Sequence, residues 1–431
     1  MRPVRFWMAG ALVPLALLPV WGQPADVNYD ETKVPRYVLP DPLRFSDGRP
    51  VKTAREWFDR RRPEILRLFE TWMHGRWPAP KVKLRAEQLE VDRAALGGRA
   101  IRKQLVIPFS HDASGPRMHL LVYLPAKAPR PVPVFVGLNF SGNHAVHPDP
   151  GIRLADIWVR DPKQQAWRKQ TALANTRGSA ASRWLVEMIL ERGYGLATAY
   201  YGDIEPDFDG GIRYGVRPLF FRPGQTEPAP DEWGAIGAWA WGLSRALDYL
   251  ETDREVDARR VIVIGHSRLG KTALWAAAQD TRFAMAISND SGEGGAAITR
   301  RRFGEQIHHV NARFPHWFCR NFRQFDHRED ELPVDAHMLI ALIAPRPVYV
   351  ASAQEDRWAD PRGEFLALAN AAPVYRLLGR PAPELTEMPP VGKPVMDTLG
   401  YHIRAGKHDI TPYDWEQFLA FADRHLQRAR R

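Results

Sequence analysis

One stretch of the sequence decides the fold: Val261-Ile262-Val263-Ile264-Gly265-His266-Ser267-Arg268-Leu269-Gly270-Lys271-Thr272. Its four consecutive β-branched residues predict a strand that is buried on both faces. The glycines on either side of the serine predict a tight turn, and the residues from Lys271 onward predict a helix. The stretch therefore predicts a strand, a sharp turn with Ser267 at its apex, and the start of a helix.

Two functional motifs fit this turn. Gly265 followed by Gly270-Lys271-Thr272 matches the P-loop pattern G-x-x-x-x-G-K-[ST], which cradles phosphates. Ser267 between a strand and a helix matches a nucleophile elbow, although that motif has glycine where this chain has Leu269. We favour the elbow because more than half of the chain precedes the motif, whereas P-loops usually open their domain. An acid and a histidine also follow Ser267 in the order that an elbow requires.

Strands and helices alternate on both sides of this stretch. The alternation predicts an α/β protein in three layers, with a mostly parallel central sheet, helices on both faces, and loop insertions at 145–180 and 203–232. We expect strands at 101–107, 118–124, 132–138, 195–200, 261–264, 283–288 and 347–352. We expect helices at 54–76, 182–191, 235–249, 271–278, 337–342, 362–378 and 414–429.

The composition is that of a folded protein. Among 431 residues, 45% are hydrophobic and 26% are charged, which excludes disorder as the main state. The single cysteine, Cys319, excludes an intrachain disulfide and a cysteine-based zinc site. The net charge of +10 favours acidic partners without naming one.

The N-terminus has the features of a secretory signal peptide. Arg2 and Arg5 precede an apolar run at 6–18, and turn-forming residues follow it. The run is too short and too interrupted by proline for a membrane span, which needs about 20 residues. We expect cleavage near residue 22 and a bacterial protein that is secreted or periplasmic, with no stable membrane span. Cleavage would remove two arginines and no acid, leaving a net charge of +8.

We expect the chain to divide into three segments. These are the signal peptide at 1–22, an N-terminal lead-in at 23–100 that packs on the core, and one catalytic domain at 101–431. The high content of proline (37 residues) and tryptophan (15 residues) fits rigid, aromatic loops facing a substrate. We expect a monomer that binds no nucleic acid.

A serine nucleophile needs a base and an acid, and candidates for both follow Ser267. The base is a histidine, because its pKa lies near neutrality. His408 lies in a glycine-containing loop directly before a helix and is favoured over His402, which lies in a strand-like stretch. Asp356 and Asp290 each follow a predicted strand, and the sequence leaves open which of them orients the histidine.

The motif Gly265-His266-Ser267-Arg268-Leu269-Gly270-Lys271 resembles the G-C-S-R-x-G-K signature of glucuronoyl esterases, carbohydrate esterase family 15. The resemblance extends from about residue 100 to residue 425 and is greatest to the bacterial members. It implies an α/β-hydrolase fold and no cofactor or metal. It also implies hydrolysis of the ester that joins 4-O-methyl-glucuronic acid of glucuronoxylan to lignin alcohols, so the partner would be a lignin–carbohydrate ester.

The resemblance also implies roles for individual residues. Ser267 matches the nucleophile and His408 the base. The acid of the family matches Asp290 in fungal members and Asp356 in many bacterial ones, and this chain has both. Arg268 matches the arginine that stabilises the oxyanion. The residues that match sugar-binding positions are Lys271, Glu305 and Trp358.

One departure from the family concerns the loop that carries the histidine. Fungal members have a cysteine before the serine and another after the histidine, joined by a disulfide, whereas this chain has His266 and Asp409 at those positions. The bridge is therefore missing, and we expect a contact between His266 and Asp409 to replace it.

Two other functions are compatible with the sequence. One is an acetylxylan esterase or another secreted serine hydrolase. The other is a non-catalytic polysaccharide-binding relative, which would not need Ser267, His408 and an acid together.

Overall fold

A computed structural model describes residue 24 and residues 26–78, 85–112, 114–382 and 385–426. The expected signal peptide at 1–22 lies outside these residues, so it stays a prediction. None of the helices in the described ranges combines the length and the apolar character needed to cross a membrane.

The described chain alternates between strands and helices, as predicted. The strands are β1 (Glu87–Ala94), β2 (Ala100–Pro108), β3 (Arg117–Pro125), β4 (Val132–Asn139), β5 (Asp156–Arg160), β6 (Trp167–Thr171), β7 (Gly195–Tyr200), β8 (Val256–His266), β9 (Met285–Asn289), β10 (Val348–Ala353), β11 (Val395–Met396) and β12 (Leu399–Arg404). The helices are α1 (Ala54–Glu56), α2 (Arg62–Trp72), α3 (Ala95–Gly98), α4 (Val186–Glu191), α5 (Tyr201–Ile204), α6 (Ala235–Leu250), α7 (Arg268–Gln279), α8 (Ile307–Arg313), α9 (Ala336–Ala341), α10 (Pro361–Leu377) and α11 (Pro412–Leu426).

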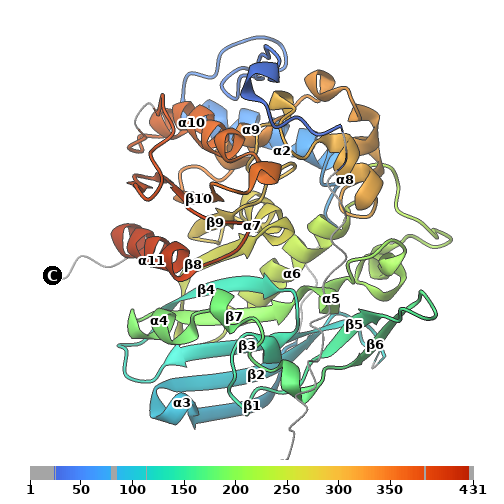
Figure 1. Ribbon diagram of the computed structural model, residues 1–431, viewed down its shortest axis with the longest axis vertical. Helices are drawn as coiled ribbons and strands as arrows, with labels where there is room; N and C mark the ends of the chain where they lie inside the picture. Colours follow the sequence, from blue (N-terminus) through green and yellow to red (C-terminus); the bar gives the residue numbers. More distant parts are fainter. Residues whose placement is uncertain (1–23, 25, 79–84, 113, 383–384, 427–431) are drawn as a thin grey trace, which may run out of the picture.

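In the described residues, ten strands form one sheet in the order β1-β2-β3-β7-β4-β8-β9-β10-β12-β11 (Figure 1). The six strands from β7 to β12 in this order run parallel to one another. The strands outside them, β1 to β3 and β11, are antiparallel to their neighbours. The predicted α/β architecture with a mostly parallel centre is therefore confirmed.

The sheet separates two hydrophobic cores because its strands alternate. In β8, Val261 and Val263 face one core, whereas Ile262 and Ile264 face the other. Helices α2, α6, α7, α9 and α10 cover the first face, and α4 and α11 cover the second. A fully buried valine or isoleucine contributes roughly 1.5–3 kcal/mol, so the central strands are held from both sides.

Five described strands are not among the expected ones: β1, β5, β6, β11 and β12, although the stretch around His402 in β12 is strand-like in sequence. β1 is an edge strand whose residues are exposed or half-buried, so polar side chains dominate it. The insertion at 145–180 contains the hairpin of β5 and β6, which form a separate two-stranded sheet beside α5 (Figure 1).

The turn between β8 and α7 has the backbone of a nucleophile elbow. Ser267 has φ 57° and ψ −130°, a conformation that costs about 1–3 kcal/mol for a residue with a side chain. The turn is so tight that a Cβ atom at Gly265 would lie 1.8 Å from the carbonyl oxygen of Leu269. Glycine at 265 is thus a steric requirement of the elbow.

We expect Gly265→Ala to lower the free energy of unfolding by about 3 kcal/mol or more, because the backbone must move to admit the methyl group. Gly379→Ala is the control: unlike Gly265 it has a positive φ (71°), which itself disfavours alanine, but no atom lies within 4 Å of the added Cβ, so the loss should be about 1 kcal/mol. Urea denaturation of both variants measures the difference, and equal losses would contradict the steric argument.

Candidate active site

The candidate catalytic residues follow the carboxyl ends of neighbouring strands. Ser267 follows β8, Asp290 follows β9, Asp356 follows β10 and His408 follows β12. These four strands are adjacent and parallel, so their carboxyl ends lie at the same edge of the sheet. The topology alone brings together residues that are 141 positions apart in the sequence.

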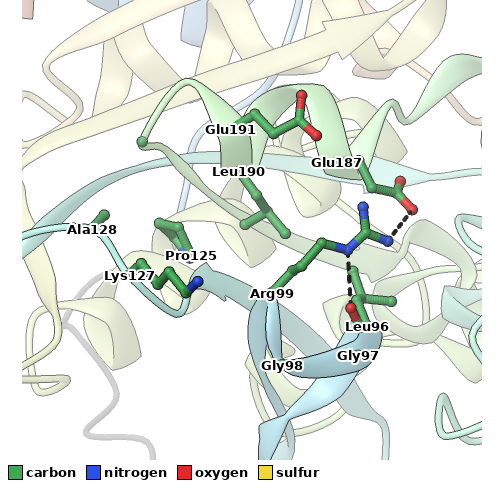
Figure 2. Close-up of a pocket in the computed structure, with 11 residues that line it drawn as sticks. Leu96, Gly97, Gly98, Arg99, Pro125, Lys127, Ala128, Glu187, Leu190 and Glu191 are labelled. Carbon is green, nitrogen blue, oxygen red and sulfur yellow. Dashed lines mark hydrogen bonds and ion pairs between the residues drawn. The ribbon is translucent and has the colours of Figure 1, made fainter.

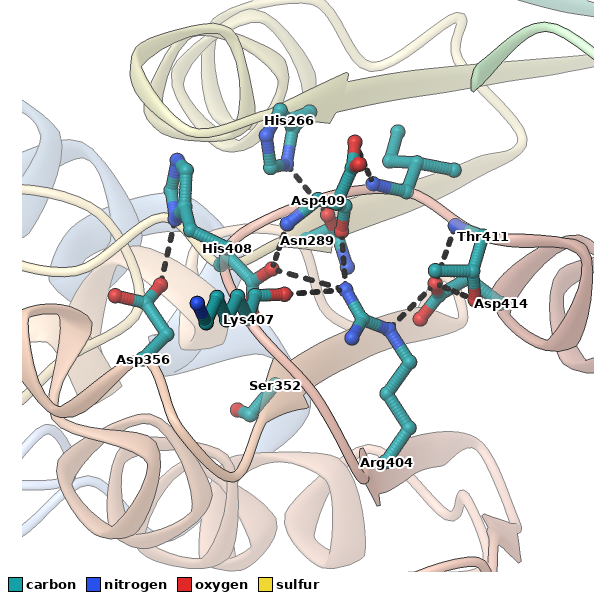
Figure 3. A network of polar contacts seen from close by, with 12 residues as sticks. His266, Asn289, Ser352, Asp356, Arg404, Lys407, His408, Asp409, Thr411 and Asp414 are labelled. Atoms are coloured by element: carbon teal, nitrogen blue, oxygen red, sulfur yellow. Dashed lines mark hydrogen bonds and ion pairs between the residues drawn. The ribbon is translucent and has the colours of Figure 1, made fainter. Parts of the chain in front are cut away.

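His408 and Asp356 form a direct pair. Nδ1 of His408 lies 2.6 Å from Oδ2 of Asp356, and the aspartate is buried while the imidazole reaches the surface (Figure 3). An aspartate in this position accepts the Nδ1 proton and leaves Nε2 of the histidine as a base. The ring of His266, the residue before Ser267, lies 4.5 Å from the ring of His408.

Asp290 lies beside this pair but bonds differently. Its carboxylate, that of Asp356 and the imidazole of His408 bring ligating atoms within 4.8 Å of one another. Oδ2 of Asp290 is 3.4 Å from the backbone N–H of Asp409 and 3.7 Å from the guanidinium of Arg404. Burial, reinforced by the negative charge of Asp356, raises the pKa of Asp290 well above its usual range.

The expected contact between His266 and Asp409 is wrong. His266 is buried and its Nδ1 lies 2.6 Å from the amide oxygen of Asn289 (Figure 3). Asp409 pairs with Arg183 instead. Burial holds the pKa of His266 well below its usual range, so this ring is neutral beside His408. The ring of His266 thus packs on the ring of His408, and its hydrogen-bond partner is Asn289 instead of Asp409.

His402, the alternative base, is enclosed within the core. Nε2 of His402 lies 2.8 Å from Asp414 and its Nδ1 lies 2.9 Å from the hydroxyl of Tyr349. Both ring nitrogens are occupied and the side chain has no exposed surface, so it has no route to a substrate.

Arg268 is held beside the elbow by a residue that the sequence analysis did not identify. Its guanidinium forms an ion pair with Asp207 and lies 4.8 Å from the centre of the Trp317 ring. Asp207 also accepts hydrogen bonds of 2.8 Å from His316 and Trp317. Although burial alone would raise the pKa of Asp207, Arg268 and His316 hold it far below its usual range.

The candidate sugar-binding residues form one connected group. The ammonium of Lys271 is buried and donates at 2.6 Å to the carbonyl oxygens of Ser291 and Glu293. It also lies 3.5 Å from the carboxylate of Glu305. The backbone N–H of Glu305 donates to the carbonyl oxygen of Trp358 at 2.9 Å. The ammonium of Lys271 thus faces three protein oxygens, one of them on the side chain of Glu305.

Two groups of described side chains gather three metal-ligating atoms each: Asp26, His308 and His309, and the set Asp290, Asp356 and His408. In the first group, Nδ1 of His309 accepts the backbone N–H of Gln306 at 3.1 Å. The proton of this neutral ring is then on Nε2, which lies 3.1 Å from Asp26 and has no lone pair for a metal. This first group is a hydrogen-bonded clamp between the N-terminal segment and α8.

A cavity of about 410 Å³ lies away from these residues, between the β2–β3 region and α4 (Figure 2). Its Arg99 is already engaged, with Nε 3.0 Å from the carbonyl oxygen of Leu96 and a guanidinium nitrogen 3.5 Å from Glu187. No serine, histidine or aspartate lines the cavity, so its chemistry does not compete with that of the elbow.

Comparisons with known proteins agree with this geometry. A family model described as glucuronyl esterase, fungi, matches residues 228–379. Carbohydrate esterase MZ0003, from an unknown prokaryotic organism, is 51% identical over 407 residues, which is 94% of both chains. The chain belongs to the glucuronoyl esterase family. A solved glucuronoyl esterase from Solibacter usitatus is 55% identical, with a TM-score of 0.89 over 92% of this chain and 100% of that one.

Membership of this family confirms the α/β-hydrolase fold and makes the chain a carboxylic ester hydrolase. A fungal relative, the 4-O-methyl-glucuronoyl methylesterase of Schizophyllum commune, is 27% identical over 80% of this chain and 74% of that one. The matched segment at 228–379 includes the elbow and both aspartates but ends before His408.

We expect Asp207→Asn to lower kcat of the esterase by about 10–100-fold, because the amide no longer balances or fixes the Arg268 guanidinium. Asp209→Asn, two positions along the same insertion, is the control and should keep the parental kcat. Steady-state kinetics on benzyl glucuronate tests both variants. Parental kcat in folded Asp207→Asn would show that Arg268 needs no anchor.

Proposed function

We propose that the esterase hydrolyses the ester between (4-O-methyl-)glucuronic acid of glucuronoxylan and lignin alcohols through an acyl-enzyme on Ser267. The observation that carries this proposal is the pairing of His408 with Asp356 beside the Ser267 elbow. The substrate is supported by the fungal relatives, which are named 4-O-methyl-glucuronoyl methylesterases.

The proposed reaction has two half-reactions. Ser267 Oγ attacks the ester carbonyl while Nε2 of His408 takes the hydroxyl proton. The tetrahedral intermediate then expels the alcohol, which receives that proton from His408. Water next gives a proton to His408 and attacks the acyl-enzyme, and His408 returns the proton to Ser267 as the uronic acid leaves.

We assign the two aspartates different roles. Asp356, at 2.6 Å from Nδ1, orients His408 and stabilises the imidazolium that forms during each step. Asp290, whose burial disfavours its charge, supports the His408 loop through the N–H of Asp409. This division leaves one aspartate, Asp356, in direct contact with the base.

The remaining site residues bind charge and sugar in this proposal. Arg268 lies directly after the nucleophile and stabilises the negative charge on the carbonyl oxygen. Lys271 and Glu305, whose charged groups lie 3.5 Å apart, bind sugar hydroxyls, and Trp358 offers its ring to the sugar. The proposed partner is therefore a lignin–carbohydrate ester, and the proposed enzyme is a secreted or periplasmic bacterial monomer that uses no cofactor or metal.

We expect Ser267→Ala to lose at least about 10³-fold in kcat on benzyl glucuronate, since no other group can form the acyl-enzyme. The fold should be retained because alanine is smaller than serine. A panel with 4-nitrophenyl acetate and acetylated xylan distinguishes the other functions. Faster turnover of the acetyl esters would favour an acetylxylan esterase, and xylan binding without turnover would favour a binding protein.

We expect Asp356→Asn to lower kcat by about 10²–10⁴-fold, because the amide favours the wrong tautomer of His408. Asp290→Asn is the matched variant and should cost less than about tenfold, since its carboxylate is paired with the N–H of Asp409 and the guanidinium of Arg404 and not with Nδ1 of His408. Kinetics on benzyl glucuronate with both variants tests the assignment. The reverse order would make Asp290 the orienting acid.

A further inference from the structure

Helix α10 places a buried carboxylate behind the candidate triad. Glu364 lies in the first turn of α10 and has no exposed surface. Its Oε1 accepts the backbone N–H groups of Ser291 at 2.7 Å and Gly292 at 3.0 Å. Its Oε2 lies 2.6 Å from the hydroxyl of Ser352. One side chain thus joins three residues by hydrogen bonds.

The partners of Glu364 lie close in sequence to the two candidate acids. Ser291 and Gly292 come directly after Asp290, beyond the end of β9. Ser352 is the penultimate residue of β10, before the loop that presents Asp356. The carboxylate of Glu364 therefore ties the ends of two neighbouring strands to one helix.

The N-terminal end of helix α10, which carries Glu364, is itself held by hydrogen bonds. Asp360 caps the helix by accepting the N–H of Gly363 at 3.0 Å. The guanidinium of Arg301 lies 2.7 Å from the same aspartate, and both side chains are buried. The helix end, and with it Glu364, is therefore held by Arg301 as well as by the end of the loop that carries Asp356.

We infer that Glu364 is a positioning residue that sets the placement of Asp290 and Asp356 around His408. The inference rests on the proposed function, in which Asp356 orients the base. Glu364 itself contacts neither His408 nor any group of the substrate in this proposal; it acts through the loops it joins. A carboxyl group suits the task because its two oxygens serve both loops at once.

The charge of Glu364 links this task to pH. Burial, reinforced by the nearby negative charge of Asp356, raises the pKa of Glu364 from its usual 4.5 to about 8. The titratable groups that face it are Asp356, Asp290 and the hydroxyl of Tyr401 on β12. Glu364 is therefore protonated at neutral pH, and its ionisation above pH 8 adds a negative charge next to two carboxyl groups.

The sign of the effect on stability follows from proton binding. Between pH 4.5 and pH 8 the folded chain holds a proton on Glu364 that the unfolded chain has released. The contribution of this proton to stability is complete below pH 4.5 and is lost progressively as the pH rises through about 8. A glutamine side chain has no such proton, so the Glu364→Gln variant escapes this loss.

The experiment compares Glu364→Gln, Glu364→Leu and Ser352→Ala with the parent. Glutamine keeps the shape: its oxygen accepts both N–H groups and its amide donates to Ser352, so kcat and KM at pH 7 should stay within about twofold. Leucine leaves all three partners unsatisfied, and kcat should fall by about 10–100-fold while KM changes little. Ser352→Ala removes one partner and should lie between them.

The second readout is the pH dependence. The parent should lose thermal stability from pH 5 to pH 8 and kcat from pH 7 to pH 9, whereas Glu364→Gln should lose less of both. If Glu364→Leu does not fold, the kcat of Ser352→Ala and the pH profiles of the parent and Glu364→Gln still test the inference. Folded Glu364→Leu with parental kcat, or identical pH profiles of the parent and Glu364→Gln, would overturn the inference.

Activity is measured on benzyl glucuronate and on 4-nitrophenyl acetate, so that the two proposals are tested separately. If the parent hydrolyses only the acetate, the substrate assignment fails, yet the effect of Glu364 on kcat can still be read. If the parent hydrolyses both esters and the variants do not differ, only the role of Glu364 fails.

Discussion

The alignment of four carboxyl ends at one sheet edge is the constraint on which the site depends. β8, β9, β10 and β12 are neighbours and run parallel, so each delivers one residue of the candidate machinery to the same place. Helices on both faces bury these strands, and the buried valines and isoleucines keep their register. A slip of one residue in β8 would exchange the two core faces.

The same arrangement brings the carboxyl groups of Asp290, Asp356 and Glu364 close together. Asp290 and Glu364 have raised pKa values because they are buried next to Asp356. Of the three, Asp356 makes the direct contact with His408, and in the proposed mechanism it is the one that stabilises the imidazolium. Arg268, the residue after Ser267, forms an opposite-charge pair with Asp207.

The sequence predicts the strands and helices of this molecule better than the buried polar side chains that hold the site residues. The β-branched run at 261–264, the glycine at 265 and the alternation of strands and helices have local signals, and the structure has the expected elements there. Asp207 and Glu364 have no local sequence signal, because each has a hydrogen-bond partner 61 or more positions away that no local pattern reveals. Edge strand β1 also lacks a signal, since one side of it faces solvent.

The loop that carries His408 shows how polar contacts can take over from a covalent bridge. Arg404, the last residue of β12, lies 2.7 Å from Asp414 and donates at 3.0 Å to the carbonyl oxygen of Lys407. The same guanidinium also donates to the carbonyl oxygen of Asp409, on the other side of His408 (Figure 3). Hydrogen bonds to a charged group contribute about 1.5–3 kcal/mol each, so two or three of them are comparable to a disulfide. Unlike a disulfide, these hydrogen bonds of Arg404 do not depend on the redox state, and they hold the loop on both sides of His408.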